Sequence, residues 1–304
     1  MRGIKFIPDE TKIDFIGRRH IALGFSALIL VASLFLVVKD GLNFGIDFTG
    51  GTLVEIKTPE DANLGTMRGA LNGLGLGAVS IQEFGAPDDL LIRLPQQDGG
   101  AEERAAALTK LRGAIDAQFE EVVDYRRTEF VGPQVGDELK KQGLMAVVFS
   151  LLGIMAYVWF RFEWQFGVAA LVALAHDALA IIGLFALTQL EFSLSTVAAI
   201  LMVAGYSIND TVVVFDRIRE NLRKYKKMPL GDLFNLTVNE TLSRTIMTSF
   251  TTVLALIALY IFGGVVIQEF VIALIFGIVI GTYSSIFIAA PLLMFMNIRR
   301  GDAE

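Results

Sequence analysis

The sequence contains six long apolar stretches that are nearly free of charged residues. A helix that crosses a bilayer needs about 17–25 predominantly apolar residues, because its backbone polar groups must be satisfied within the helix. We therefore predict six membrane spans, at residues 21–38, 143–160, 164–187, 192–215, 246–262 and 270–296. The last span is long enough to tilt, or to kink near Pro291. The pattern indicates an α-helical polytopic membrane protein.

Composition argues against several other classes of protein. The 304 residues are 54% hydrophobic and 19% charged, whereas a soluble domain has about 25% charged residues. There is no cysteine, which rules out disulfides, thiolate metal sites and cysteine nucleophiles, and two histidines argue against a multi-histidine metal centre. The net charge of −6 gives no sign of nucleic-acid binding. We expect no metal, no cofactor and no enzymatic activity.

Lysine and arginine gather in every second connection between the predicted spans. They are frequent in residues 1–20 and 216–245, and they follow the last span at 299–300. The connections 188–191 and 263–268 contain none. Basic loops stay preferentially on the cytoplasmic side of a membrane.

The charge pattern therefore predicts an orientation. Both tails, 1–20 and 297–304, and the loop 216–245 are expected in the cytoplasm, and residues 39–142 are expected to be exported. Span 21–38 has some features of a signal peptide, but a long tail precedes it and five spans follow. We interpret it as an uncleaved signal anchor.

Residues 39–142 have the pattern of a folded domain. Their periodicity predicts strands and helices in the order strand 52–57, helix 64–74, strand 79–84, turn 86–89, strand 90–94, helix 101–119 and strand 121–131. This β-α-β-β-α-β order is that of the α+β ferredoxin-like fold. The glycine-rich run 45–51 lacks the ending of a phosphate loop and does not open a helix, so we interpret it as a tight turn into the first strand. The domain has no histidine, and we expect it to bind another protein or to move against one.

Span 192–215 carries one charged residue, Asp210. Charged groups within a span are costly, usually face protein or water, and favour their neutral form when buried. At helical spacing Tyr206 and Ser207 share a face with Asp210, and Asn209 precedes it. We expect these polar side chains to line the interior of the spans.

Arg244 stands just before span 246–262, at the head of a stripe of hydroxyl groups. Residues within about 120° of arc on that helix are Thr241, Arg244, Thr245, Thr248, Thr251 and Thr252. Two interpretations stay open. The stripe is a buried and hydrated face, or Arg244 snorkels to the lipid headgroups while the threonines satisfy backbone carbonyls.

Two further groups of residues stand out within the spans. His176 and Asp177 lie near the middle of span 164–187, and because neighbours on a helix point about 100° apart they cannot chelate one metal together. They are either a neutral histidine with an interhelical hydrogen bond beside its aspartate, or part of a proton relay. Gly277, Gly281 and Ser285 form a small-residue stripe that predicts a helix-packing face.

Five motifs resemble those of the SecD/SecF family of protein-export membrane proteins. They are FGIDFTGG at 44–51, VGPQVG at 131–136, AHD at 175–177, GYSINDTVVVFDRIREN at 205–221 and NETLSRT at 239–245. The motifs are distributed along nearly the whole chain, and we see no clear departure from the family pattern at these positions.

The resemblance implies an architecture and a function. It implies one six-span half of a resistance-nodulation-division unit, whose other half would be the SecD subunit. It further implies an accessory role in the Sec preprotein translocase of the bacterial cytoplasmic membrane, where the proton-motive force promotes late steps of export. The implied partners are SecD, the SecYEG channel, translocating preproteins and, as a further candidate, YajC. The family's proton-pathway aspartate and arginine correspond to Asp210 and Arg244.

Two alternatives belong to other functional classes. A proton-driven exporter of small molecules or lipids from the same superfamily would usually have twelve spans and larger exported domains. An intramembrane enzyme would need a catalytic pair or metal ligands within the spans. One His-Asp dipeptide, at residues 176–177, is not enough to indicate either. The sequence therefore favours the export-subunit interpretation.

Overall fold

The computed structural model describes residues 11–77, 79–97, 99–296 and 298, and it separates into two compact units. Phe44–Leu144 form one unit, which contains the small sheet, and the rest of the described chain forms the helical unit. The boundary between them lies within one long helix, α5 (Pro133–Arg161).

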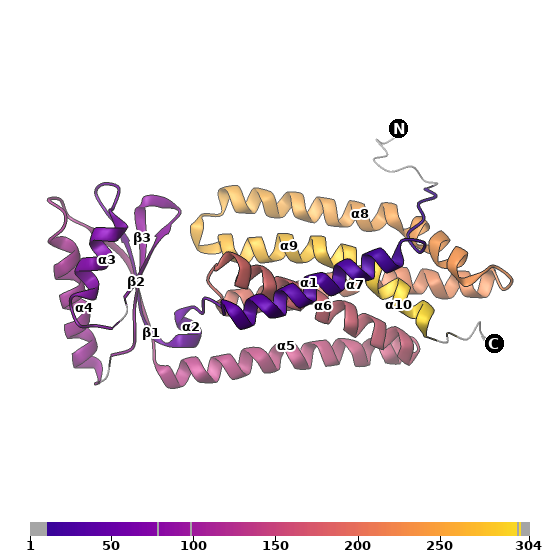
Figure 1. Cartoon of the computed structure of the whole chain (residues 1–304), viewed down its shortest axis with the longest axis horizontal. Helices are drawn as coiled ribbons and strands as arrows, with labels where there is room; N and C mark the ends of the chain where they lie inside the picture. The colour runs from indigo at the N-terminus through magenta and orange to yellow at the C-terminus, as the bar shows by residue number, and fades with distance from the viewer. Residues whose placement is uncertain (1–10, 78, 98, 297, 299–304) are drawn as a thin grey trace. The chain divides into compact units, whose positions relative to one another are not determined.

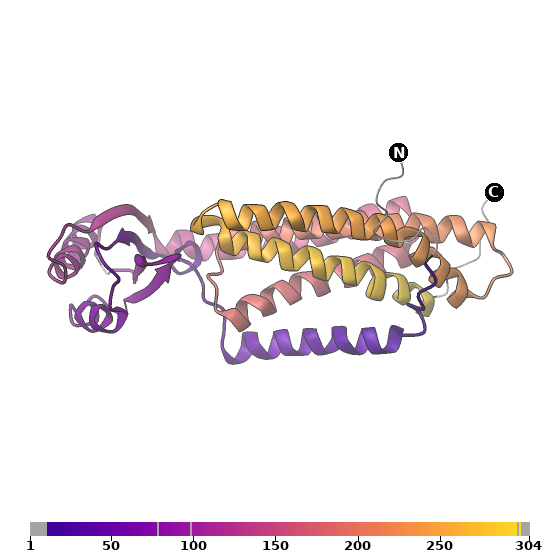
Figure 2. The same ribbon diagram turned by 90° about the horizontal axis from the view of Figure 1, so that it is seen from above.

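The long apolar helices follow the predicted spans (Figures 1 and 2). Besides α5 they are α1 (Arg19–Lys39), α6 (Trp164–Thr188), α7 (Leu194–Lys224), α8 (Leu230–Phe262), α9 (Gln268–Ser284) and its continuation α10 (Ala290–Phe295). Within the described ranges, six helical segments are long and apolar enough to cross a membrane. The prediction of a six-span, mainly helical protein is confirmed.

The sixth span changes its winding near its end. Between α9 and α10, Ser285–Ala289 form a π-helical turn, and Pro291 is the second residue of α10. Proline has no backbone N–H, and its ring crowds the carbonyl four residues earlier. The regular hydrogen-bond ladder cannot continue there, and the wider π turn accommodates the break.

The helices α7 and α8 extend beyond the spans predicted for them. α7 continues to Lys224 and α8 begins at Leu230, so residues 216–245, predicted as a loop, are helical except at 225–229. The additional turns bury apolar side chains at helical spacing, namely Ile218, Leu222, Leu233, Phe234, Val238 and Leu242. Charged residues stand between these positions, so the segment contains no continuous apolar block and was not predicted as part of a span.

The interior of the helical unit is formed by α6, α7 and α9. α1 packs on α6, and α8 packs on α7 and α9. In the apolar windows of α6 and α9, 61% of the residues are buried, against 11% in α5 and in α8. α5 and α8 therefore present most of their surface to lipid or to another chain.

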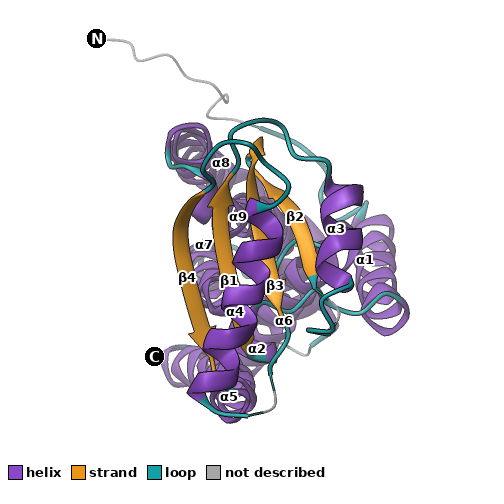
Figure 3. Ribbon diagram, turned by 90° about the vertical axis from the view of Figure 1, so that its left-hand side faces the viewer, coloured by secondary structure: helices purple, strands orange, loops and turns teal. Residues whose placement is uncertain are grey.

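The second unit has the predicted β-α-β-β-α-β order (Figure 3). Its elements are β1 (Gly51–Lys57), α3 (Leu64–Asn72), β2 (Ser80–Phe84), β3 (Ala86–Leu94), α4 (Ala101–Asp116) and β4 (Asp124–Val131). The sheet has the order β2-β3-β1-β4, and every neighbouring pair is antiparallel. α3 and α4 cover one face of it, and their apolar side chains share a core with β1 and β3. This is the ferredoxin-like arrangement.

The turn between β2 and β3 differs from the prediction. Residues 86–89 belong to β3, and the chain reverses at Gly85, whose φ is +92°. The backbone is held there because Thr58 donates its N–H to the carbonyl of Asp88 at 2.7 Å. Lys57 lies 3.0 Å from the Asp88 carboxylate, and this contact lowers the pKa of Asp88.

The glycine-rich run forms one turn of helix and then the first strand. α2 (Ile46–Thr49) ends at Gly50, and β1 begins at Gly51. Both glycines have positive φ, and a Cβ on Gly51 would lie 2.5 Å from the carbonyl oxygen of Leu94. The tight turn into the strand is present, while the short helix of α2 was not predicted.

Candidate functional site

Asp210 is buried in the helical unit, with only 3% of its surface exposed. It lies on α7 and faces α8, where Arg244, Thr248 and Ser249 interact with its carboxyl group. Within the described part of the chain, its Oδ2 atom accepts no hydrogen bond. A buried carboxylate oxygen without a donor is costly, so this group is suited to taking up a proton or a new partner.

Arg244 lies near Asp210 without pairing with it. Its side chain is exposed, and among the described residues no ion pair joins it to Asp210. The neighbouring hydroxyl of Thr245 is buried and has no hydrogen-bond partner in the described structure. The α7–α8 contact thus brings the Asp210 carboxyl group and the Arg244 guanidinium group near each other, but no ion pair joins them among the described residues.

The other threonines of the stripe bond mainly to their own helix. Thr241 donates to the carbonyl of Thr237 at 3.1 Å, and Thr248 donates to that of Arg244 at 3.1 Å. Thr251 and Thr252 donate to carbonyls one turn earlier in the same way. Thr248 in addition interacts with the carboxyl group of Asp210.

The polar run before Asp210 points in three directions. The hydroxyl of Tyr206 lies 3.3 Å from that of Thr252 on α8. Ser207 is buried and points to α6, whereas Asn209 is exposed. The structure therefore does not gather Tyr206, Ser207 and Asn209 around one site.

A second buried polar cluster lies where α6, α7 and α9 meet. Oδ2 of Asp177 accepts hydrogen bonds from Ser207 at 2.7 Å and from Ser284 at 2.8 Å. Its Oδ1 atom lies 3.1 Å from Nδ1 of His176. The interhelical bonds are thus made by Asp177, whereas His176 bonds to its neighbour on the same helix. The buried Nε2 atom of His176 has no partner among the described residues.

The small-residue stripe on α9 allows a close approach to α7. A Cβ on Gly277 would lie 2.3 Å from Cγ2 of Val203, and one on Gly281 would lie 3.0 Å from Oγ of Ser207. Ser285 bonds to Thr211 at 2.8 Å. Gly277, Gly281 and Ser285 thus lie in the contact with α7.

Sequence reasoning missed several residues of these clusters. Ser284 stands in the polar run Thr282–Ser285 and Thr211 directly follows Asp210, and these neighbours were the available signal. Asn221 and Glu240 lie in the segment predicted as a loop, and without helices there the sequence did not indicate that they face each other.

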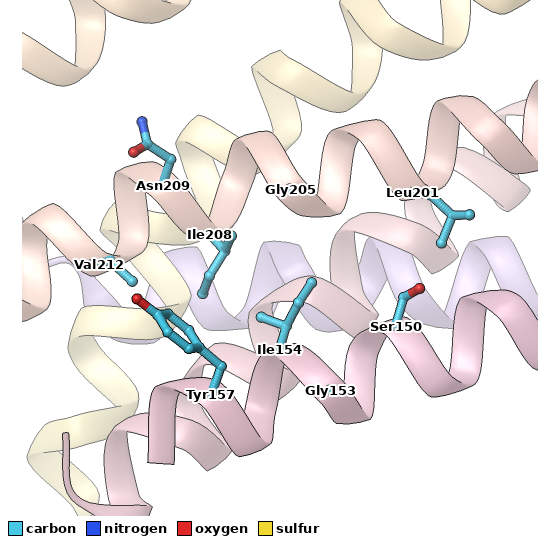
Figure 4. Close-up of a pocket in the computed structure, with 9 residues that line it drawn as sticks. All are labelled: Ser150, Gly153, Ile154, Tyr157, Leu201, Gly205, Ile208, Asn209 and Val212. Atoms are coloured by element: carbon cyan, nitrogen blue, oxygen red, sulfur yellow. The ribbon is translucent and has the colours of Figure 1, made fainter. Parts of the chain in front are cut away.

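A groove separates α5 from α7 (Figure 4). It has a volume of about 620 Å³ and is lined by Ser150, Gly153, Ile154, Tyr157, Leu201, Gly205, Ile208, Asn209 and Val212. Ile154 and Ile208 point toward each other across it. At Gly153 and Gly205 an added Cβ would meet nothing within 4 Å, so packing within the chain does not require glycine at either position.

Comparison with known proteins places these features in a family. The family model for "Protein export membrane protein SecD/SecF, C-terminal" matches residues 113–299, which include Asp177, Asp210 and Arg244. The chain belongs to the SecD/SecF family. A second model of this family, for the SecD/SecF GG motif, matches residues 35–58, which contain the glycine turn before β1.

Similar SecD/SecF proteins cover the chain almost completely. A protein translocase subunit SecF of Rickettsia rickettsii is 45% identical over 295 residues, or 97% of this chain and 95% of the relative. A subunit of the same name from Cereibacter sphaeroides is 45% identical over 307 residues, or 99% of this chain and 94% of the relative. Both are named as translocase subunits rather than as enzymes.

Solved SecDF structures have the same fold. The crystal structure of SecDF from Thermus thermophilus, a translocon-associated membrane protein, matches with a TM-score of 0.86 and 36% identity over 97% of this chain. A structure of SecDF in a super-membrane-facing form matches with a TM-score of 0.71. This chain spans 40% of the length of each of those SecDF chains.

Proposed function

We propose that this protein is an accessory subunit of the Sec preprotein translocase and that it couples the proton-motive force to late steps of export across the bacterial cytoplasmic membrane. Asp210 is the proton-binding carboxylate, and Arg244 controls its charge. One observation carries the proposal: in a family of protein-export proteins, the buried Asp210 has an oxygen without a donor and faces the helix that bears Arg244.

Energy coupling follows from the chemistry of this pair. When Arg244 approaches, the ionised form of Asp210 is stabilised, and when it withdraws the carboxyl group takes up a proton. A proton that crosses about 100 mV releases about 2.3 kcal/mol. This free energy is available to bias a conformational equilibrium of the helices, which the exported domain would transmit to a preprotein.

The test replaces Asp210 with asparagine, which has nearly the same shape but cannot titrate. Proton-driven export by membrane vesicles containing the Asp210→Asn variant should fall to the level measured without a gradient, while the membrane abundance of the complex is unchanged. Asp232→Asn is the matched control, because Asp232 is an exposed carboxylate on α8. Normal gradient-dependent export by the Asp210→Asn variant would refute the proposal.

SecD is the proposed partner within the membrane. Its spans would supply the second half of the architecture, in keeping with the 40% of a SecDF chain that this protein covers. The groove between α5 and α7 is the proposed place of contact, since Gly153 and Gly205 leave room there for the close approach of another helix. SecYEG, preproteins and YajC are further partners that the family assignment suggests.

The contacts of His176 and Asp177 favour an anchoring role over a proton relay. Both carboxylate oxygens of Asp177 have partners, and two of these partners come from other helices. Such a group holds α6, α7 and α9 together. Within the described structure, the Nε2 atom of His176 is the only polar side-chain atom of this pair without a hydrogen-bond partner, so it is the atom available to a proton relay.

A further inference from the structure

A polar clamp joins α7 and α8 near the connection at 225–229. Oε2 of Glu240 accepts hydrogen bonds from Nε of Arg217 at 2.7 Å and from Nδ2 of Asn221 at 2.8 Å. Asn221 also lies 2.9 Å from the hydroxyl of Thr237, and both of these residues are fully buried. We call Arg217, Asn221, Thr237 and Glu240 the α7–α8 clamp. The surrounding apolar core contains Ile218, Leu222, Leu233 and Val238.

The part of α8 that follows is much less firmly packed. All buried residues of α8 lie at or before Ser249, and residues 250–262 are all partly or fully exposed. The polar contacts of this part include Tyr206 with Thr252 at 3.3 Å and Ser249 with Thr282 at 2.6 Å. One helix is thus held tightly at one end and weakly along the rest.

The helix contacts also define the register of the proton site. Asn221 lies beside Thr237, Arg217 beside Glu240, and Tyr206 beside Thr252, so the helices run antiparallel without a change of register. By this register Asp210 is level with residues 247–248. Because a helix rises 1.5 Å per residue, Arg244 lies about 5 Å nearer to the clamp, along the helix axis, than the level of Asp210.

We propose that the clamp is a fixed point about which α8 moves beyond Leu242, its last residue in the apolar core, so that the separation of Asp210 and Arg244 changes while the clamp stays closed. The inference rests on the proposed role of Asp210 and Arg244. It makes Asn221 and Glu240 positioning residues, because they set the register of the two helices without touching the titrating group. Opening the clamp would leave a buried amide and a carboxylate unpaired, whereas moving the rest of α8 breaks few contacts.

Distances between spin labels test the fixed point directly. The native chain has no cysteine, so pairs can be introduced at exposed positions without background labelling. Arg223→Cys with Asp232→Cys reports on the clamp, and Met202→Cys with Leu254→Cys reports on the loosely packed part. In proteoliposomes containing the complex with a cysteine-free SecD, a proton gradient should shift the second distance and leave the first unchanged. A shift in the clamp pair, or no shift in either pair, overturns the inference.

A reversible crosslink provides the functional measurement. Met202→Cys with Leu254→Cys, joined by a reducible bifunctional thiol reagent, should stop proton-driven export while the crosslink is present, and export should resume when the crosslink is reduced. The single-cysteine variants are the controls. Export that continues with the crosslink formed contradicts the proposed movement.

The positioning role of Glu240 has its own readout. Glu240→Ala should let the clamp distance change with the gradient and should reduce export several-fold. Glu240→Gln keeps one acceptor oxygen, so its clamp distance should stay nearly constant and its export should be close to that of the native protein. A clamp distance in Glu240→Ala that stays constant under the gradient would contradict this role.

The two proposals fail separately, provided that Asp210→Asn is measured in the same vesicles. If that variant exports normally, the proposed function fails. If that variant stops export but the Met202–Leu254 crosslink does not, only the fixed-point inference fails.

Discussion

Ser207 of α7 donates a hydrogen bond to Asp177 of α6 across 2.7 Å, inside the membrane-spanning helices. Ser207 lies three residues before Asp210 on the same face of α7. The proposed proton site is therefore carried by a helix that is anchored within one turn of Asp210. Asp177 is the anchor, and Ser284 of α9 binds to the same oxygen.

Removing a serine donor should weaken this anchor. Ser207→Ala leaves the buried carboxylate with one donor fewer, and the expected loss is about 1–3 kcal/mol of stability. Ser284→Ala should cost a similar amount, but Ser207→Ala should reduce proton-driven export more, because Ser207 lies on the helix of Asp210. Thermal unfolding of the purified complex and vesicle export are the measurements. Ser195→Ala, at an exposed position, is the control, and equal behaviour of all three variants would contradict the anchor.

Substitution of Arg244 should separate charge from shape. Arg244→Met keeps most of the side-chain length but removes the charge that stabilises ionised Asp210, so gradient-driven export should be lost. Arg244→Lys should retain part of it, since the charge is kept. Because Arg244 is exposed, neither change should lower membrane abundance. Arg223→Met serves as the matched control at an exposed arginine of α7, and full export by Arg244→Met would argue against the role of its charge.

Glycine-to-alanine changes should distinguish packing within the chain from contact with SecD. Gly277→Ala places a methyl group 2.3 Å from Val203, and overpacking of this kind costs about 1–3 kcal/mol. Gly153→Ala and Gly205→Ala meet nothing within 4 Å, so the chain alone should keep its stability. Affinity purification should nevertheless recover less SecD with the latter two. Unchanged recovery would move the partner contact away from the α5–α7 groove.

The orientation of the chain can be tested with single cysteines. Val122 is 94% exposed in the small-sheet unit, so Val122→Cys should react with an impermeant maleimide added outside intact cells. Lys227→Cys, in the basic connection between α7 and α8, should react only after the cytoplasmic side is opened. The reverse labelling pattern would invert the proposed topology.

Much of the fold was predictable because it depends on local properties of the chain. The length of an apolar block predicts a span, and the alternation of strands and helices predicted the ferredoxin-like order. The same local patterns singled out Asp210, Arg244 and the stripe of Gly277 and Gly281. They failed at residues 216–245, where an apolar stripe is interrupted by charged residues.

The sequence by itself determined the number of spans, the fold class of the small-sheet unit and the positions of the charged residues within the spans. Only the tertiary structure decided which of those polar groups are satisfied. Asp177 accepts hydrogen bonds from α7 and α9, and Glu240 accepts them from α7, whereas one oxygen of Asp210 has no partner among the residues that the structure describes. These differences arise from how far each helix is rotated and shifted against its neighbours. That arrangement is set by side-chain packing between segments far apart in the sequence, and no local pattern records it.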